Sequence, residues 1–99
     1  MTRVMVRYTV HPDRAEENAE LVRAVYAELA AAAPDGFRYS TYRCDHGVTF
    51  VHLASSDGPA PLPGIAAFQR FQEGLPQRCA VAPVFTELRE VGSYGGPQG

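Results

Sequence analysis

The sequence predicts an α+β domain with one four-stranded antiparallel sheet and two helices on one face of that sheet. Two segments alternate apolar and polar residues with the period of two that is typical of a half-buried strand, and two more are rich in the aromatic and β-branched residues that strands favour. Two further segments repeat apolar residues every three or four positions, as amphipathic helices do. The chain has 99 residues, 45% hydrophobic and 20% charged, which suits one folded domain. We expect that domain to span residues 1–94 and the Gly-rich residues 95–99 to form a flexible tail.

The first strand and the first helix are predicted from the N-terminal third of the chain. Residues 3–10 (RVMVRYTV) alternate, and their more apolar side consists of Val4, Val6, Tyr8 and Val10. Pro12 suits the first turn of a helix, and acidic residues follow it, near the positive end of the helix dipole. One apolar stripe then contains Val22, Val25, Tyr26, Leu29 and Ala33, and the helix ends at Pro34-Asp35-Gly36.

A hairpin, a second helix and a last strand follow. Residues 37–44 (FRYSTYRC) and 48–54 (VTFVHLA) are rich in aromatic and β-branched residues and are joined by Asp45-His46-Gly47, which suits a turn closed by a left-handed glycine. Residues 55–64 form a Pro- and Gly-rich loop before a helix that Gly74 and Pro76 bend or break, and residues 83–91 alternate again. This strand-helix-strand-strand-helix-strand order is the split βαβ arrangement of ferredoxin-like folds, with one sheet face left bare.

The alternation predicts which side chains lie on the bare face. If the apolar side of the first strand meets the helices, Met5 and Arg7 lie on the bare face. On the third strand we expect Val51 and Leu53 to meet the helices. Phe50 and His52 would then lie on the bare face. A three-residue hairpin loop pairs Tyr42 with Phe50 and Ser40 with His52, whereas a two-residue turn brings Thr41 and Tyr39 to that surface instead.

Composition excludes several classes of partner. The net charge of −2 and the absence of lysine disfavour nucleic acid and anionic membranes. The N-terminus lacks the pattern of a secretory signal, so we expect a cytoplasmic protein with Cys44 and Cys79 as free thiols. His11, His46 and His52 lie on different elements without matching carboxylates, so the sequence predicts no metal site and no cofactor.

A bare face that carries Met5, Tyr42 and Phe50 is more apolar than the water-exposed surface of a monomer usually is. Two such sheets packed face to face about a twofold axis would bury the apolar surface and enclose a space at the centre. The sequence therefore predicts a homodimer formed through the open sheet face, with a possible small aromatic ligand inside.

Nearly the whole chain resembles the dimeric α/β-barrel superfamily, and within it the antibiotic biosynthesis monooxygenase-like domains. The similar segments are RYTVHPDRAEENAELVRAVYAEL, GFRYSTYR, GVTFVHLAS, AFQRFQ and PVFTELREVGSY. The resemblance implies a ferredoxin-like protomer, a sheet-to-sheet homodimer and, in some relatives, cofactor-independent oxygenation of polycyclic aromatic substrates. The chain has no tryptophan, and its only asparagine is Asn18 in the first helix, so the tryptophan- and asparagine-containing catalytic sets of relatives do not carry over.

His52 and Arg7 are the candidate catalytic residues. His52 could serve as a general base, or it could be a structural histidine bonded to Ser40 or to a backbone carbonyl across the dimer. Arg7 could stabilise an anion inside the barrel, or it could form an interface salt bridge to Glu87 or Glu90. The predicted substrate-binding residues are Met5, Ser40, Tyr42, Phe50 and Phe68, although aromatic residues at this spacing also suit a core.

Two functions fit these residues. In the first, a homodimeric protein oxidises a small aromatic or quinone-like molecule with molecular oxygen. In the second, the same dimer is a non-catalytic ligand-binding or structural module. The two hypotheses differ in whether the space that contains His52 and Arg7 is hollow.

Overall fold

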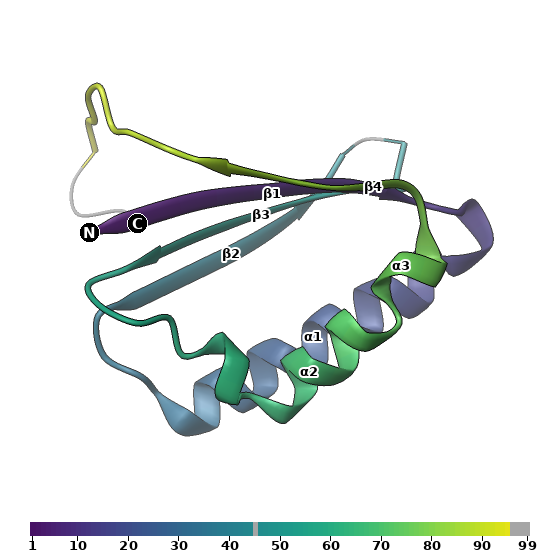
Figure 1. The fold of residues 1–99 in the computed structure, drawn as a ribbon, viewed down its shortest axis with the longest axis horizontal. Coiled ribbons are helices and arrows are strands. Elements are labelled where there is room, and N and C mark those ends of the chain that lie inside the picture. Colours follow the sequence, from purple (N-terminus) through teal and green to yellow (C-terminus); the bar gives the residue numbers. More distant parts are fainter. Residues whose placement is uncertain (45, 96–99) are drawn as a thin grey trace.

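The computed structural model describes residues 1–44 and 46–95 of the chain. The predicted order of elements is confirmed, with the second helix divided in two (Figure 1). The strands are β1 (Thr2–Val10), β2 (Phe37–Arg43), β3 (Thr49–Ser56) and β4 (Cys79–Glu87), and the helices are α1 (Ala15–Ala32), α2 (Ala66–Glu73) and α3 (Leu75–Arg78). A 3₁₀ turn at Pro12–Arg14 precedes α1, and a second one at Leu62–Gly64 precedes α2.

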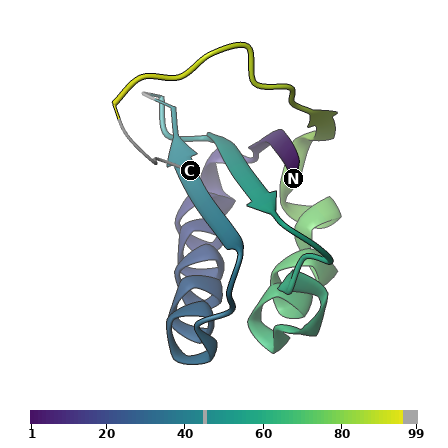
Figure 2. The ribbon, with the colours of Figure 1, turned by 90° about the vertical axis from the view of Figure 1, so that its left-hand side faces the viewer.

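The four strands form one antiparallel sheet in the order β2-β3-β1-β4. Both long helices lie on the same face of this sheet, side by side, and leave the opposite face open (Figures 1 and 2). The architecture is therefore the ferredoxin-like α+β fold that the sequence predicts. Because β3 and β1 are the central strands, side chains on their helix side are enclosed by neighbours from both layers.

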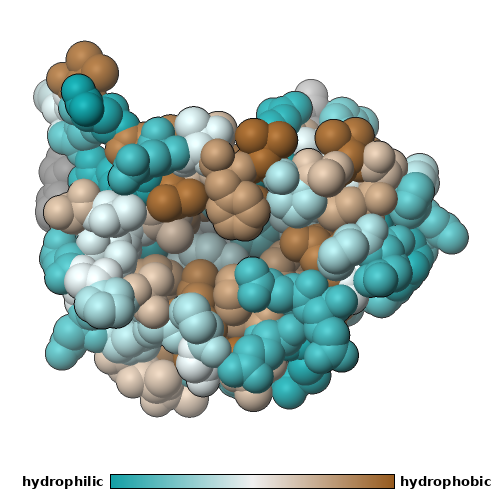
Figure 3. Space-filling view, in the orientation of Figure 1, coloured by the Kyte–Doolittle hydropathy of each residue, from teal (hydrophilic) through white to brown (hydrophobic). Residues whose placement is uncertain are grey.

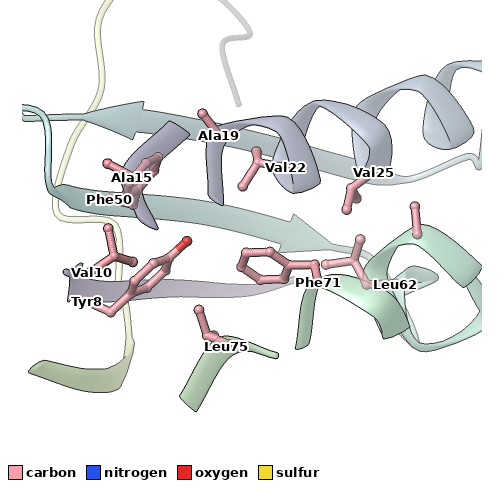
Figure 4. Close-up of a cluster of buried hydrophobic side chains, with 11 residues drawn as sticks. Tyr8, Val10, Ala15, Ala19, Val22, Val25, Phe50, Leu62, Phe71 and Leu75 are labelled. Atoms are coloured by element: carbon pink, nitrogen blue, oxygen red, sulfur yellow. The ribbon is translucent and has the colours of Figure 1, made fainter. Parts of the chain in front are cut away.

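The core lies between the sheet and the helices, where Tyr8 and Phe50 meet Val22 and Phe71 (Figure 4). α1 contributes its predicted apolar stripe, of which Val22 and Val25 are buried. The helix ends at Ala32, where Ala33 takes a left-handed conformation (φ 46°) and donates its N–H to the Leu29 carbonyl.

Helix α2 has no side chain of its own to cap its first turn. Glu28 of α1 supplies one, because its Oε1 accepts the Ala67 N–H at 3.0 Å, and its Oε2 meets Arg70. One carboxylate thus joins the two helices and satisfies an otherwise unpaired amide.

The prediction for the faces of β3 was wrong. Phe50 and His52 lie on the helix side, 2% and 4% exposed, while Val51 and Leu53 are half-buried on the open face. Strand pairing explains the result, since His52 lies opposite Val6 and Phe50 opposite Tyr8 on the apolar side of β1. A histidine can occupy this core because neighbouring side chains satisfy both of its ring nitrogens.

The structure also decides between the two hairpin registers that the sequence leaves open. β2 and β3 pair Thr41 with His52 and Tyr42 with Val51, and the Cys44 N–H donates to the Thr49 carbonyl. The register thus differs by one residue from that of a three-residue loop and gives the face assignment predicted for a two-residue turn. Gly47 has the predicted positive φ, at 82°.

The last strand begins earlier than predicted, at Cys79, and ends at Glu87. Its ladder with β1 is irregular: Arg7 pairs with Val84, but Thr9 pairs with Val81. Pro83, which lacks an N–H, lies within this bulge on an edge strand, a position at which sheets tolerate proline. The sequence prediction placed the strand at residues 83–91 because the apolar and polar residues alternate there.

Beyond β4 the chain crosses over the open face toward β2 (Figure 2). The crossing begins where the Leu88 N–H donates to the Arg3 carbonyl, and farther along Ser93 and the fully exposed Tyr94 line one cavity together with Tyr42. Of the tail predicted at residues 95–99, all but Gly95 lies outside the described residues.

Candidate functional site

A chain of hydrogen-bonded polar side chains runs through the core between the sheet and the helices. His52 is at its centre: Nε2 lies 2.8 Å from the Tyr8 hydroxyl, and Nδ1 lies 2.8 Å from the Tyr39 hydroxyl and 3.0 Å from Thr41 Oγ1. Thr41 in turn meets the Tyr26 hydroxyl at 2.8 Å. The chain therefore links β1, β2, β3 and α1 through polar atoms in an otherwise apolar layer.

The other end of the chain reaches α3. Asn18 Nδ2 donates to the Tyr8 hydroxyl at 2.9 Å, and Arg78 Nε donates to Asn18 Oδ1, also at 2.9 Å. Arg78 also donates to the Phe71 carbonyl at 2.7 Å. Asn18 and Arg78 are 0% and 1% exposed, so a guanidinium is buried at this end.

Each buried polar residue lies in phase with apolar neighbours. Asn18 lies four residues before Val22 on the buried side of α1, and Arg78 follows the buried Leu75 by three residues. His52 lies two residues after Phe50, on the same face of β3. Tyr8 belongs to the apolar side of β1. These positions place the polar groups in the core, and the same phase marks Asn18 and Arg78 in the sequence as candidates for burial without showing what they bind.

Gly74 makes room for the Arg78 guanidinium. A Cβ atom at position 74 would lie 2.8 Å from Arg78 Nη1, which is too close for an ordinary contact. Because Asn18 and the Phe71 carbonyl hold the guanidinium, it could not move aside without losing these bonds. The ring of Phe71 covers another side of it, 5.3 Å from the guanidinium carbon.

Burial controls the protonation of these groups. It lowers the pKa of His52 to about 4, so the imidazole is neutral at pH 7. It raises the pKa values of the Tyr8 and Tyr39 hydroxyls well above the usual range, so both are protonated phenols. Burial also lowers the pKa of Arg78, with Glu17 as the main opposing charge, but a guanidinium remains a cation at neutral pH.

Aromatic rings line this chain of hydrogen bonds. Tyr8 stacks on Phe50 with ring centroids 5.7 Å apart, and His52 stacks on Tyr8 at 5.3 Å and on Tyr39 at 5.8 Å. Tyr26 lies 5.2 Å from Tyr39 at an angle of 19°. The stack fixes the planes of the rings, so it also fixes the directions in which their polar atoms can bond.

The structure divides the predicted site residues between the two faces of the sheet. His52, Phe50 and Phe68 lie on the helix side, and Phe68 is half-buried against Phe71 with ring centroids 6.0 Å apart. The remaining predicted residues are on the open face: Met5, Arg7, Ser40 and Tyr42. His52 and Arg7 are therefore separated by the sheet and do not form one site. The sequence prediction omitted Tyr8, Asn18, Tyr39, Thr41 and Arg78.

The structure also bears on the alternative roles predicted for His52 and Arg7. The hydrogen bonds of His52 come from Tyr8, Tyr39 and Thr41 of the same chain, and Ser40 is exposed on the other face. Glu90, one predicted partner of Arg7, forms its salt bridge with Arg3.

The other predicted features lie apart from this chain of hydrogen bonds. His11 and His46 are exposed, and Cys44 and Cys79 are free thiols, as predicted. Within residues 1–44 and 46–95, no cluster of three or more potential metal ligands occurs. None of the helices in that part of the chain has the length and apolar character to cross a membrane.

Two hollows flank the layer that contains the chain of hydrogen bonds. One is a groove of about 320 Å³ between the end of α1 and β2, lined by Tyr26, Leu29, Ala30, Ala33, Pro34, Phe37 and Tyr39. The other is visible in Figure 3, where the surface is hollowed between the sheet and the helices on the side of β4 and α2. A further cavity of about 350 Å³ lies on the open face beneath the C-terminal segment, beside Ser40 and Tyr42.

No family model matches the sequence, and no curated protein matches it either. Solved structures do match the fold. A putative antibiotic biosynthesis monooxygenase from Nitrosomonas europaea superposes with a TM-score of 0.74 at 14% identity, over 93% of this chain and all 100% of that one. Rv0793 from Mycobacterium tuberculosis gives 0.69 at 19% identity, over 95% and 98%. A mutant of SnoaB, a cofactor-independent oxygenase from Streptomyces nogalater, gives 0.67 at 15% identity, over 93% and 94%.

The chain thus shares its fold with a putative antibiotic biosynthesis monooxygenase and with a cofactor-independent oxygenase, as the resemblance in its sequence implies. Because fewer than one residue in four is identical, these likenesses concern the fold. The chemistry has to be argued from the side chains of this protein.

Proposed function

We propose that the protein is a small-molecule monooxygenase-like protein that acts on an aromatic or quinone-like substrate without metal or haem. The substrate would lie on the helix side of the sheet, in the hollow between β4 and α2 (Figure 3), and not between two facing sheets. Phe68 of α2 and Phe85 of β4 would form its walls; Phe85 pairs with Val6 and is 68% exposed. The fold that the chain shares with a cofactor-independent oxygenase supports this class of reaction.

The buried guanidinium of Arg78 is the observation that carries the proposal. In the described part of the chain both of its recorded hydrogen bonds end on uncharged acceptors, Asn18 Oδ1 and the Phe71 carbonyl. A buried cation without a bonded carboxylate is costly, and an anion that forms beside it offsets that cost. Arg78 therefore suits a site in which an aromatic substrate loses a proton.

Such an anion can react with molecular oxygen without a cofactor when its charge is delocalised over aromatic rings. A CH₂ group between two aryl rings loses a proton, the carbon gives an electron to O₂ and then bonds to it, and the hydroperoxide formed loses water. The balance is CH₂ plus O₂ to C=O plus H₂O, so oxygen serves as both reagent and oxidant. The part of the protein is to bind the ring, exclude water and stabilise the anion.

His52 has a positioning role in this proposal. Both of its ring nitrogens are engaged, and its pKa of about 4 makes it a weak base at pH 7. It would hold the Tyr8 hydroxyl, which Asn18 connects to Arg78. The general-base role that the sequence suggested is the less favoured one.

Oxygen uptake with a panel of anthrones and quinols tests the proposal. We expect turnover by the wild type and a fall of roughly 100-fold or more in Arg78→Met, because removal of one electrostatic stabiliser typically costs that much. Arg23→Met, at an exposed position on α1, is the matched control and should retain full activity. Absence of uptake above the uncatalysed rate, with every substrate of the panel, would refute catalysis of this kind.

A non-catalytic binding protein is the second candidate. It is favoured by the internal hydrogen bonding of His52, Tyr8 and Asn18, which need no substrate to be satisfied. In that case the same panel would bind, as measured by calorimetry, without oxygen uptake.

A homodimer formed through the open face is part of the proposal. The open face carries Met5, Val51 and Leu53 at the centre and the exposed side chains Tyr42 and Val84, 57% and 59% accessible, at either side. A second copy would cover this apolar surface. The free thiols Cys44 and Cys79 support a cytoplasmic location.

A further inference from the structure

At one end of the open face, two arginines lie on either side of a serine. Ser55 on β3 pairs with Arg3 on β1 and with Arg38 on β2, so the three residues form one row across the sheet. Directly paired residues share a face, and Leu53, two residues before Ser55, lies on it as well. Neighbouring strands are about 4.8 Å apart, which places the Cα atoms of the two arginines about 10 Å apart. A ligand above Ser55 would therefore lie within reach of both side chains.

The row lines the cavity of about 350 Å³ beneath the C-terminal segment, residues 88–95. Apolar side chains and hydroxyl-bearing side chains both contribute to its walls. These are Leu53, Leu88, Ser40, Tyr42, Ser55 and Ser93. The volume is at the lower end of the usual range for small-molecule pockets. The cavity thus suits a small ligand with an apolar body and a polar head.

The charges that line this cavity do not balance. Arg3 forms a salt bridge with Glu90, and this carboxylate offsets its charge. Arg38 takes part in no ion pair with any residue of the described part of the chain. Two guanidiniums and one carboxylate leave the lining with a balance of +1, in a chain whose net charge is −2. A single negative charge in the cavity would therefore be attracted to Arg38.

The Ser55 hydroxyl is a second group with no protein partner. The residue is 8% exposed, yet its Oγ has no hydrogen bond within residues 1–44 and 46–95, whereas Oγ of the adjacent Ser56 donates to the Gly58 carbonyl at 3.0 Å. In the same residues only Arg3 Nε is both without a partner and completely enclosed by protein atoms. The Ser55 hydroxyl must therefore reach the free space of the cavity, where it can donate to a ligand.

We propose that this cavity binds the carboxylate of a small organic acid with an apolar body. The carboxylate oxygens would accept hydrogen bonds from the Arg38 guanidinium and the Ser55 hydroxyl, while the apolar body packs against Leu53 and Leu88. A carboxylate suits the balance of +1 better than a phosphate monoester, which carries about −1.5 to −2 charges at pH 7. The site lies on the opposite face of the sheet from the hollow proposed for the substrate. One chain supplies all of its walls, so it requires neither oxygenation nor the dimer.

Titration calorimetry with hexanoate and hexanamide at about pH 7 tests the ligand class. The two probes share one apolar chain and differ in that the carboxylate is charged and the amide is not. We expect hexanoate to bind roughly tenfold more tightly, as one hydrogen bond to a charged group provides, and high salt to weaken this preference. In NMR spectra hexanoate should shift the methyl signals of Leu53 and Leu88.

Two variants test whether the row is responsible for the preference. Arg38→Gln should lower the affinity for hexanoate roughly tenfold and leave that for hexanamide nearly unchanged, and Ser55→Ala should lower the affinity for hexanoate roughly threefold to tenfold. Both should fold, because Arg38 is exposed and Ser55→Ala removes an oxygen without a protein partner. Arg23→Gln, at an exposed position on α1, is the matched control and should bind hexanoate as the wild type does.

Any of four results would overturn the site: no binding of hexanoate at millimolar concentration, equal affinity for the two probes, wild-type affinity in Arg38→Gln, or NMR shifts confined to residues outside the cavity. None of them depends on oxygen uptake. A protein that oxidises the anthrone panel but does not prefer hexanoate would retain the proposed function and lose this site. A protein that prefers hexanoate in this cavity but oxidises no anthrone would retain the site and refute the proposed function.

Discussion

Acidification should destabilise the protein through His52. The imidazole is neutral at pH 7 in both the folded and the unfolded chain; on acidification it gains a proton near pH 6.5 when unfolded but only near pH 4 when folded. Between these values the unfolded chain binds more protons, so the free energy of unfolding falls as the pH falls through this window and levels off below about pH 4. Each unit of pKa difference corresponds to about 1.4 kcal/mol, so the free energy of unfolding falls by about 3 kcal/mol in total. Roughly 2 kcal/mol of this stability is lost by about pH 4.5.

Urea unfolding at about pH 7 and about pH 4.5 measures this loss. Because other groups also titrate, the informative quantity is the difference between the wild type and His52→Gln, whose amide can form hydrogen bonds but does not titrate. The wild type should lose roughly 2 kcal/mol more than the variant. His46→Gln, on the exposed hairpin loop, should behave like the wild type. Equal losses in the wild type and in His52→Gln would refute the reasoning, as would an NMR titration of His52 near pH 6.5.

Two further predictions concern helix α2 and the open face. Glu28→Ala removes the cap on the Ala67 N–H and should lower the free energy of unfolding by about 1 kcal/mol in thermal or urea unfolding, whereas Glu20→Ala, in an exposed pair with Arg23, should change it little. Leu53→Asp places a charge at the centre of the open face and should convert a dimer into monomers in sedimentation experiments, while Gln72→Asp on α2 should not. A wild-type monomer at micromolar concentration would contradict the dimer itself.

The order of the elements could be predicted because each element has its own local pattern. The face of β3 could not be predicted in this way, because both sides of the strand carry large apolar residues and the polar His52 at its middle is itself buried, only 4% exposed. The direction of alternation is settled only by the pairing with Tyr8 on β1 and with Thr41 on β2. An incorrect face for one strand was enough to place His52 beside Arg7, from which the sheet separates it.

The members of the candidate site come from distant parts of the sequence, which is why no local motif revealed it. Asn18 and Arg78 are 60 residues apart and meet only when α1 and α3 pack on the same sheet. A polar residue in phase with an apolar stripe can be a surface residue at a helix boundary or a buried group with a partner. Sequence periodicity does not distinguish these cases, because the partner lies on another element.

The contact between position 74 and the Arg78 guanidinium has a consequence for how such proteins can diverge. A side chain at position 74 is excluded only while the guanidinium occupies that space. We therefore expect the two positions to change together among homologues: glycine where the arginine is kept, and alanine or larger residues where a shorter side chain has replaced it. A lineage that loses the arginine first and then fills position 74 could not regain the arginine by a single substitution, so loss of the buried cation would tend to be permanent.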